Sequence, residues 1–344
     1  TLNSNISYHY TASDRIDLNP GFSYAPARGK SALFEIDEMM MFPPTYGTGV
    51  STANDPNLAV QAPAGMPYSL PMMTNANDNG AAVITIPIDC PPGANGLKPD
   101  LSFVYNSQAG DGIMGPGWSI GGMSKISRVP YKYYYSNYSN AVNFTNQDDY
   151  SLDGIRLIKG NDGKYYPEVF DNSVITFANN SFIVSKPNGY VYTYGGTNDS
   201  KHYPQGITSN PVEWHISSIQ DPYGNTINFS YSKDNDGGFY PSQISYSGYT
   251  IQFNYHSAER NDTQKKFFAD NTQQTGYSKI TKILDNLDFN KGNEGIHSYH
   301  LTYMPLGDLP NRELQFIQKY GTYNEVKSKP SYAENCTASC QFVW

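Results

Sequence analysis

Along much of the chain, apolar and polar residues alternate one by one, which is the period of a β-strand with one buried face. The pattern is clearest in four segments that each end in tyrosine, at residues 190–194, 227–231, 251–255 and 299–303. A tyrosine at the end of such a face can bury its ring while its hydroxyl reaches water or a partner. These segments are therefore predicted to be strands at the rim of a sheet.

Turn-forming sequences separate these segments, at residues 161–163, 187–189, 221–225 and 247–248. Glycine and asparagine supply positive φ there, and proline presets a turn. Strands this closely spaced favour antiparallel hairpins over strands joined by crossover helices. The sequence predicts an all-β protein of antiparallel, meandering sheets and hairpins with little helix. A short helix is expected only within residues 311–320, and residues 258–276 are expected to form a polar loop.

The chain is expected to have two parts. Residues 1–79 contain Pro43-Pro44 and an asparagine-rich stretch, which predicts a few strands followed by a linker. Residues 80–344 carry the main β domain. The segment 75–80 has oxygen ligands at the alternate spacing of a calcium loop, but Ile86 stands where such a loop needs Glu. A polar linker is therefore favoured over a calcium site.

Composition and charge exclude several classes of protein. The 344 residues include 30 Tyr, and the aromatic content of 14% supplies buried area that disordered chains lack. The net charge is −8 and the basic residues are scattered, so nucleic acid is not expected as a partner. The apolar runs are far shorter than the ~18 residues of a membrane helix, so no membrane span is expected.

Signatures of catalysis and metal binding are missing from the sequence pattern. There is no Gly-x-Ser-x-Gly, and the glycine-rich stretch 110–122 lacks the Lys-Ser/Thr of a phosphate loop. The six histidines do not have metalloprotease spacing. We expect no catalytic residue, no cofactor and no metal. A hydrolase whose site forms only in space stays open as an alternative.

From residue 80 onward, short motifs follow one another in a specific order. They are residues 84–88, 91–93, 96–97, 101–107, 112–120 and 126–128. The series reads as a strand, a reversal at Pro91, Pro92 and Gly93, a second strand, and a glycine-rich turn with Gly115, Gly117 and Trp118. It resembles the amino-terminal domain of the Salmonella plasmid virulence protein B family, which also opens the B components of insecticidal Tc toxins.

The resemblance extends to the end of the chain. The turn with Asp221, Gly224 and Asn225 is similar to the tyrosine-aspartate (YD or RHS) repeats of the same protein group. Residues 336–344 look like the end of the domain just before the family's propeller-type repeats. Cys336 and Cys340 are close enough in sequence to form a small disulfide loop or to stay reduced.

The resemblance implies a non-catalytic role. In the virulence protein family, ADP-ribosyl transfer resides in a separate carboxy-terminal domain marked by Glu-x-Glu, which this sequence lacks. In Tc toxins the corresponding domain contributes to a hollow β-sheet shell that encloses a toxic polypeptide. The chain is expected to be a structural module of a bacterial toxin or surface protein, with propeller and RHS-repeat regions of the same protein, or toxin-complex subunits, as partners.

Secretion or a place on the cell surface is the expected localisation. The segment 16–22 resembles a short strand-turn motif of exported Bacteroidetes proteins. The alternative function is an aromatic-rich module that binds carbohydrate or protein through Tyr131, Tyr133, Tyr134 and Tyr135, because exposed aromatic rings anchor interfaces. Burial of such rings over a large sheet is favoured over this alternative, since tyrosine alternates in register with apolar residues.

Overall fold

The computed structural model divides the chain into two compact units, residues Pro67–Cys340 and residues Thr1–Met66 with Gln341–Trp344. It describes residues 8–12, 32–36, 68–137, 141–145, 148–256, 260, 263–269, 275–305, 312–321 and 336–341. In the first sixty-six residues the described strands are β1 (Tyr8–Ala12) and β2 (Ala32–Ile36), which pair in parallel. The larger unit begins before residue 80, the boundary expected from the sequence.

One part of the larger unit is a ring of antiparallel strands that closes on itself. The ring runs through β10 (Lys125–Val129), β11 (Asp149–Leu152), β12 (Ile155–Lys159), β13 (Tyr165–Pro167), β14 (Val174–Ala178), β15 (Ser181–Ser185), β16 (Val191–Tyr194) and β18 (Glu213–Gln220). It closes because β18 pairs with β16 and also with β10. Strands in a closed ring leave no edge exposed.

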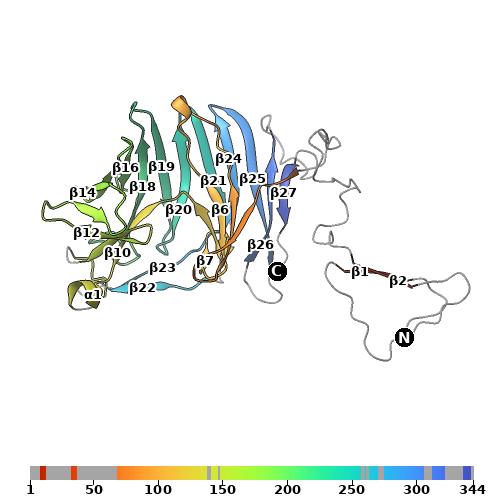
Figure 1. The fold of residues 1–344 in the computed structure, drawn as a ribbon, viewed down its shortest axis with the longest axis horizontal. Helices are drawn as coiled ribbons and strands as arrows, with labels where there is room; N and C mark the ends of the chain where they lie inside the picture. Colours follow the sequence, from red (N-terminus) through yellow and green to blue (C-terminus); the bar gives the residue numbers. More distant parts are fainter. Residues whose placement is uncertain are drawn as a thin grey trace, which may run out of the picture. The chain divides into compact units, whose positions relative to one another are not determined.

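From β18 the same sheet continues as a meander, which Figure 1 shows in sequence order from green to blue. Its strands are β19 (Thr226–Lys233), β20 (Phe239–Tyr246), β21 (Tyr249–Tyr255), β24 (Leu284–Lys291), β25 (Glu294–Pro305), β26 (Arg312–Tyr320) and β27 (Cys336–Gln341). The short strand β3 (Tyr68–Ser69) pairs in parallel with β27. Another short strand, β17 (Lys201–His202), lies beside the first half of β18.

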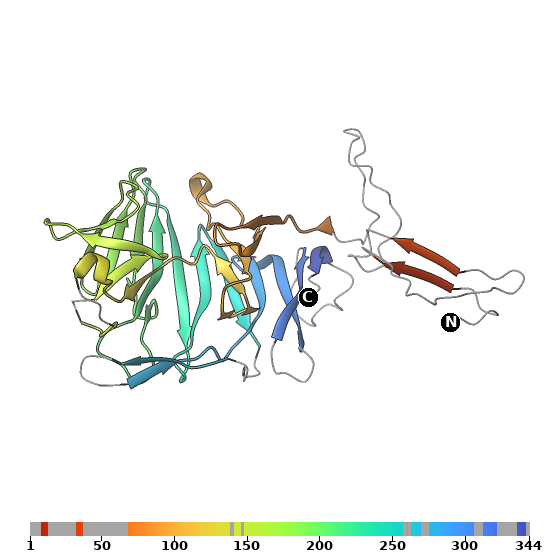
Figure 2. The same ribbon diagram turned by 60° about the horizontal axis from the view of Figure 1, so that its bottom comes forward.

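Smaller elements complete the larger unit (Figure 2). A second sheet contains β4 (Met73–Ala76), β5 (Ala82–Pro87), β6 (Ser102–Asn106) and β9 (Trp118–Gly121). Two hairpin pairs are β7 (Asp111–Gly112) with β8 (Gly115–Pro116), and β22 (Lys266–Ala269) with β23 (Thr275–Ser278). The described helices are a 3-10 turn, η2 (Ala94–Gly96), and α1 (Tyr133–Ser136). The all-β, antiparallel prediction is confirmed.

The four alternating segments form or lie within β16, β19, β21 and β25, each of which pairs with neighbours on both sides, so the prediction that they lie at the rim of a sheet is wrong. The hydroxyl groups of their terminal tyrosines nevertheless find hydrogen-bond partners inside the protein. Tyr231 donates to the Ile216 carbonyl at 2.7 Å, Tyr255 to the Pro241 carbonyl at 2.8 Å, and Tyr303 to the Leu284 carbonyl at 2.6 Å. The Tyr194 hydroxyl lies 2.8 Å from Ser124 Oγ. Each ring therefore adds buried area while its hydroxyl is hydrogen-bonded.

Aromatic side chains fill the interior of the ring. Tyr150, Phe182 and Trp214 contact one another with ring centroids 5.0–5.6 Å apart. The guanidinium of Arg128 lies 5.1 Å from the centre of the Trp214 ring and donates to Asp148 at 2.9 Å. The side chains of this ion pair are only 2% and 3% exposed. A buried charge is tolerated there because Arg128 also donates to the Pro211 and Thr145 carbonyls.

The second sheet packs on the meander through a few specific contacts. Phe103 of β6 meets Tyr299 of β25 edge to face, with ring centroids 5.6 Å apart. The Asp89 amide donates to the Tyr299 hydroxyl at 3.0 Å, and Tyr246 of β20 donates to the Pro91 carbonyl at 2.9 Å. Segments more than 150 residues apart in sequence are joined in this way.

Three further local predictions were wrong. Residues 311–320 contain β26 instead of a helix. Leu314, Ile317 and Tyr320 are buried at a spacing of three residues, which resembles that of a helix, but the segment pairs with β25 as a strand that contains a bulge. The expected polar loop 258–276 contains β22 and the start of β23. In the segment 75–80, the first two residues end β4 and the rest form the turn into β5, where Asn77 Oδ1 accepts from the Asn79 and Ala81 amides. That last segment is a hairpin turn, because its side-chain oxygens bind nearby backbone.

Candidate functional site

A pocket of about 790 Å³ opens where the ring meets the meander. Side chains from β10, β17, β18 and β23 line it together with the turn before β20. Five of its polar lining residues are linked by side-chain contacts: Lys125, His202, Glu213, His215 and Ser278. This group is called the Glu213 cluster below.

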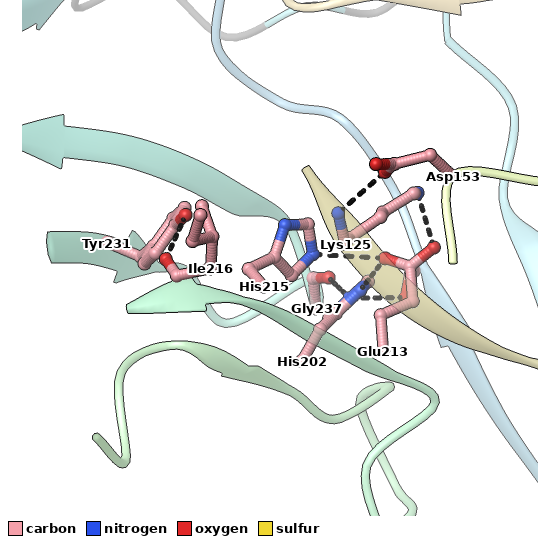
Figure 3. A network of polar contacts seen from close by, with 9 residues as sticks. Lys125, Asp153, His202, Glu213, His215, Ile216, Tyr231 and Gly237 are labelled. Atoms are coloured by element: carbon pink, nitrogen blue, oxygen red, sulfur yellow. Dashed lines mark hydrogen bonds and ion pairs between the residues drawn. The ribbon is translucent and has the colours of Figure 1, made fainter. Parts of the chain in front are cut away.

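Glu213 is the centre of the cluster (Figure 3). Its Oε1 accepts from Lys125 Nζ at 2.5 Å. Its Oε2 lies 3.0 Å from His202 Nδ1 and 3.2 Å from His215 Nε2. Two imidazoles therefore converge on one carboxylate oxygen, while an ammonium group occupies the other.

Strand register brings these residues together. Glu213 and His215 are two positions apart on β18, so they share one face of the strand. His202 on β17 is directly opposite Glu213, and Lys125 on β10 is directly opposite His215. The intervening residue, Trp214, points the other way and contacts the aromatic interior of the ring.

A tight turn fixes the second nitrogen of His202. His202 Nε2 lies 3.0 Å from the Gly237 carbonyl and 3.1 Å from Ser278 Oγ. Gly237 has φ +70°, and a Cβ there would lie 2.6 Å from the Tyr277 carbonyl, so only glycine fits without strain. Asp234 shapes the turn by accepting from the Asp236 and Gly238 amides. The turn thus presents a carbonyl to His202.

Burial and hydrogen bonding set the charges in the cluster. Burial alone would raise the pKa of Glu213, but hydrogen bonds with His202 and His215 and the Lys125 charge hold that pKa well below its usual range. Burial lowers the pKa of His215, although Glu213 acts against this. The His215 ring is stacked on Phe239 with centroids 4.1 Å apart. Glu213 is accordingly ionised at neutral pH.

The sequence pattern alone does not reveal this cluster. Its one local signal is Glu213-x-His215 in an alternating strand, which places both side chains on the same face. His202 and Lys125 come from separate strands, and only the pairing register brings them close. The imidazole nitrogens and the carboxylate of the cluster are groups that can hold a transition-metal ion.

The residues predicted from the sequence lie elsewhere, in separate places. Pro91, Pro92 and Gly93 lie between β5 and β6. A Cβ on Gly93 would lie 2.5 Å from Ser247 Oγ, and Ser247 Oγ accepts from the Ala94 amide at 2.9 Å. The reversal therefore passes directly against the hairpin turn between β20 and β21.

The glycine-rich turn surrounds a buried indole. Trp118 is 1% exposed and packs on Tyr105, with ring centroids 5.3 Å apart. Gly115 and Gly117 have φ of +92° and +75°. A Cβ on Gly117 would lie 2.6 Å from the Tyr105 ring. The backbone at Gly117 thus lies close to the Tyr105 ring, and Tyr105 in turn covers Trp118.

The Asp221 turn joins β18 to β19. Asp221 Oδ1 accepts from the Tyr223 and Asn225 amides at 2.9 and 2.8 Å, and Oδ2 accepts from Asn225 Nδ2 at 2.8 Å. Gly224 has φ +87° with open space around it, so backbone conformation alone requires glycine there. The contacts of Asp221, Gly224 and Asn225 are therefore those that form a turn between two strands.

Cys336 and Cys340 both belong to β27. Their side chains lie outside the described residues, so the disulfide stays a prediction. It requires a local departure from this strand, because residues four apart in an extended strand are separated by about 13 Å, and a disulfide spans at most about 7 Å between Cα atoms.

The tyrosines considered for binding lie at and beside α1. Tyr133 and Tyr134 are 70% and 86% exposed. Tyr135 packs under the Arg156 guanidinium at 4.1 Å and donates to Glu168 at 2.5 Å. Burial over a sheet, as expected from the alternation, holds for strand tyrosines such as Tyr194 and Tyr231, but not for Tyr133, Tyr134 and Tyr135, which are exposed.

Comparison with known proteins gives a family match within the larger unit. Residues 76–160 match the family model described as Salmonella virulence plasmid 65kDa B protein. The resemblance to this family is confirmed. No curated protein matches the chain in sequence.

Solved structures extend the likeness over most of the chain. The N-terminal domain of effector protein SpvB from Salmonella typhimurium strain LT2 matches with TM-score 0.55 and 15% identity, over 70% of this chain and 99% of that chain. The Photorhabdus luminescens Tc holotoxin pore matches with TM-score 0.61 and 12% identity, over 79% of this chain and 16% of that chain. A TcdB2-TccC3-Cdc42 structure matches with TM-score 0.54 and 15% identity, over 70% and 15%. The chain therefore shares its fold with Tc toxin components and spans about one sixth of their length.

Within the described residues, no helix combines the length and the apolar character needed to span a membrane.

Proposed function

We propose that this chain is a non-catalytic structural module of a secreted toxin of the Tc or RHS type, contributing to a β-sheet shell that encloses or presents a toxic carboxy-terminal polypeptide. The observation that carries the proposal is the continuous hydrogen-bonded sheet from β10 through the closed ring and the meander to β27. A wall needs such continuity, because each backbone hydrogen bond to a neighbouring strand removes an exposed edge.

The fold likeness supports the same role. The matched domain of SpvB is almost entirely covered, whereas the Tc chains continue far beyond the matched part. A module of this kind works together with further parts of a larger protein. Its partners would be propeller and RHS-repeat regions downstream in the same protein, or toxin-complex subunits, and it would act outside the producing cell or on its surface.

The test uses the native full-length product. An antibody against this domain would measure its size in the culture medium and on the cell surface, and limited proteolysis would map the resistant core. We expect a product much larger than the 38.3 kDa of this chain, with a resistant core that contains the domain and sequence beyond it. A free product of 38.3 kDa would overturn the proposal.

A matched pair of variants tests the shell itself. Trp118→Ala removes a buried indole, and Tyr134→Ala removes a ring that is 86% exposed. In the full-length protein, the first change should expose the enclosed polypeptide to protease and the second should leave it protected. Equal protection in both variants, with Trp118→Ala shown to loosen the domain, would contradict an enclosing role.

A further inference from the structure

We propose that His202, Glu213 and His215 bind one divalent transition-metal ion of the zinc class at the pocket between the ring and the meander. Each residue offers one ligand atom, and the three atoms lie within 4.8 Å of one another. Imidazole nitrogen and carboxylate oxygen are the ligands that zinc takes in sites with three protein ligands. The inference is independent of the proposed shell role.

Two of the three separations between ligand atoms are close to those in a tetrahedral metal site, and the third, between the two imidazole nitrogens, is within 4.8 Å. In a tetrahedral site with bonds of about 2.0–2.1 Å, neighbouring ligand atoms are about 3.3 Å apart. Glu213 Oε2 lies 3.0 Å from His202 Nδ1 and 3.2 Å from His215 Nε2. Side-chain shifts of a few tenths of an ångström are enough to admit the ion at these two contacts.

Outer contacts already orient two of the ligands. Metal-binding histidines usually donate their other ring N–H to a carbonyl or carboxylate. His202 Nε2 lies 3.0 Å from the Gly237 carbonyl, on a turn that glycine alone can form. Lys125 Nζ binds Glu213 Oε1 and leaves Oε2 for the ion. Carboxylate ligands are held in this way by second contacts.

The pocket gives the ion a path and a fourth position. Its volume of about 790 Å³ opens directly onto the three ligands. A zinc ion with three protein ligands takes water or a bound group as the fourth. Lys266 and Lys279 also line the pocket, as does Asp111, whose carboxylate is paired with Arg260. An anionic group is therefore the kind of exogenous ligand that this position would favour.

The ion would also join strands. His202 belongs to β17 and the other two ligands to β18, the strand that closes the ring against β10. Because the ligands are on neighbouring strands, metal binding would stabilise the native pairing of β17 with β18. Thermal stability should therefore rise with metal concentration.

The experiment is a metal titration of the whole chain after removal of bound metal with a chelator. Co²⁺ serves as the probe because its visible d–d bands differ between four-coordinate and six-coordinate ions, and Zn²⁺ should displace it. We expect one ion per chain, four-coordinate Co²⁺ bands and a rise in Tm with Zn²⁺. Absence of both the bands and the Tm rise in the unmodified chain would overturn the proposal.

Variants locate the site. His215→Gln and Glu213→Gln should each weaken Zn²⁺ binding more than tenfold. His256→Gln, which removes a half-exposed histidine beside Asp285, is the matched control and should leave affinity unchanged. If Glu213→Gln fails to fold, His215→Gln and the Co²⁺ spectrum of the unmodified chain still test whether the ion binds at this site. Binding that persists in His215→Gln, or is lost in His256→Gln, would place the ion elsewhere and refute this site.

Discussion

His297 should make the stability of the protein fall as the pH drops below neutrality. The residue is 7% exposed, is stacked on Phe289 with ring centroids 4.3 Å apart, and donates from Nε2 to the Asp89 carbonyl at 2.9 Å. Burial, helped by the Lys319 charge and opposed by Asp89, lowers the pKa of His297 to about 4. In the unfolded chain the pKa is about 6.5.

The sign follows from proton binding. Well above pH ~6.5 the imidazole is neutral in both states and contributes no pH dependence. As pH falls from ~6.5 to ~4, only the unfolded state takes up the proton, so stability is lost at up to ~1.4 kcal/mol per pH unit. Over the full window the loss is about 3.4 kcal/mol, and between pH 7 and pH 5 it is about 2 kcal/mol.

The measurement compares His297→Gln with the unmodified chain in urea unfolding at pH 7 and pH 5, followed by tryptophan fluorescence. Glutamine keeps a donor for the Asp89 carbonyl and does not titrate. Other groups contribute equally to both proteins, so the difference in their unfolding free energies should change by about 2 kcal/mol between the two pH values. His256→Gln controls for loss of an imidazole. An unchanged difference for His297→Gln would refute the reasoning.

Three further predictions concern substitutions in the core and the turns and their effect on the free energy of unfolding. Trp118→Ala should cost about 3–5 kcal/mol because the indole is 1% exposed, and unchanged thermal melting would show that the ring is not part of the core. Arg128→Met should cost about 3–5 kcal/mol because it leaves Asp148 charged and buried. Lys186→Met breaks a partly exposed pair with Asp171 and should cost at most about 1 kcal/mol in urea titrations. Gly224→Ala should cost about 1–2 kcal/mol, because alanine is strained at the positive φ of this position. Gly117→Ala should cost more, because its Cβ would also meet the Tyr105 ring. Equal Tm shifts for the two variants would contradict the close packing at Gly117.

The alternating strands could be predicted because their signal is local. In β19, burial of Ile227, Phe229 and Tyr231 follows the period of two that the residues themselves display. Turns such as 221–225 are equally local, since Asp221 binds the amides of its own turn. The fold class and the order of strands along the meander could therefore be predicted from short segments of sequence.

Closure of the ring and assembly of the Glu213 cluster could not be predicted in this way. Both depend on β18 pairing with β10, a strand some ninety residues earlier in the sequence, and no short pattern specifies that register. The same reason explains the error at β26, where pairing along β25 decides the conformation and the three-residue spacing of buried side chains misleads.

The two faces of β18 explain why the polar cluster is informative. Trp214 and Ile216 face the core, as any ring strand requires, while Glu213 and His215 bury polar groups on the opposite face. Replacing a buried ionic group with well-packed apolar residues is often neutral or stabilising, so strand pairing alone does not require a carboxylate and two imidazoles there. Three possible ligand atoms within 4.8 Å of one another beside an open pocket are the arrangement on which the proposed metal site rests, and metal binding would give these polar groups a role that strand pairing does not.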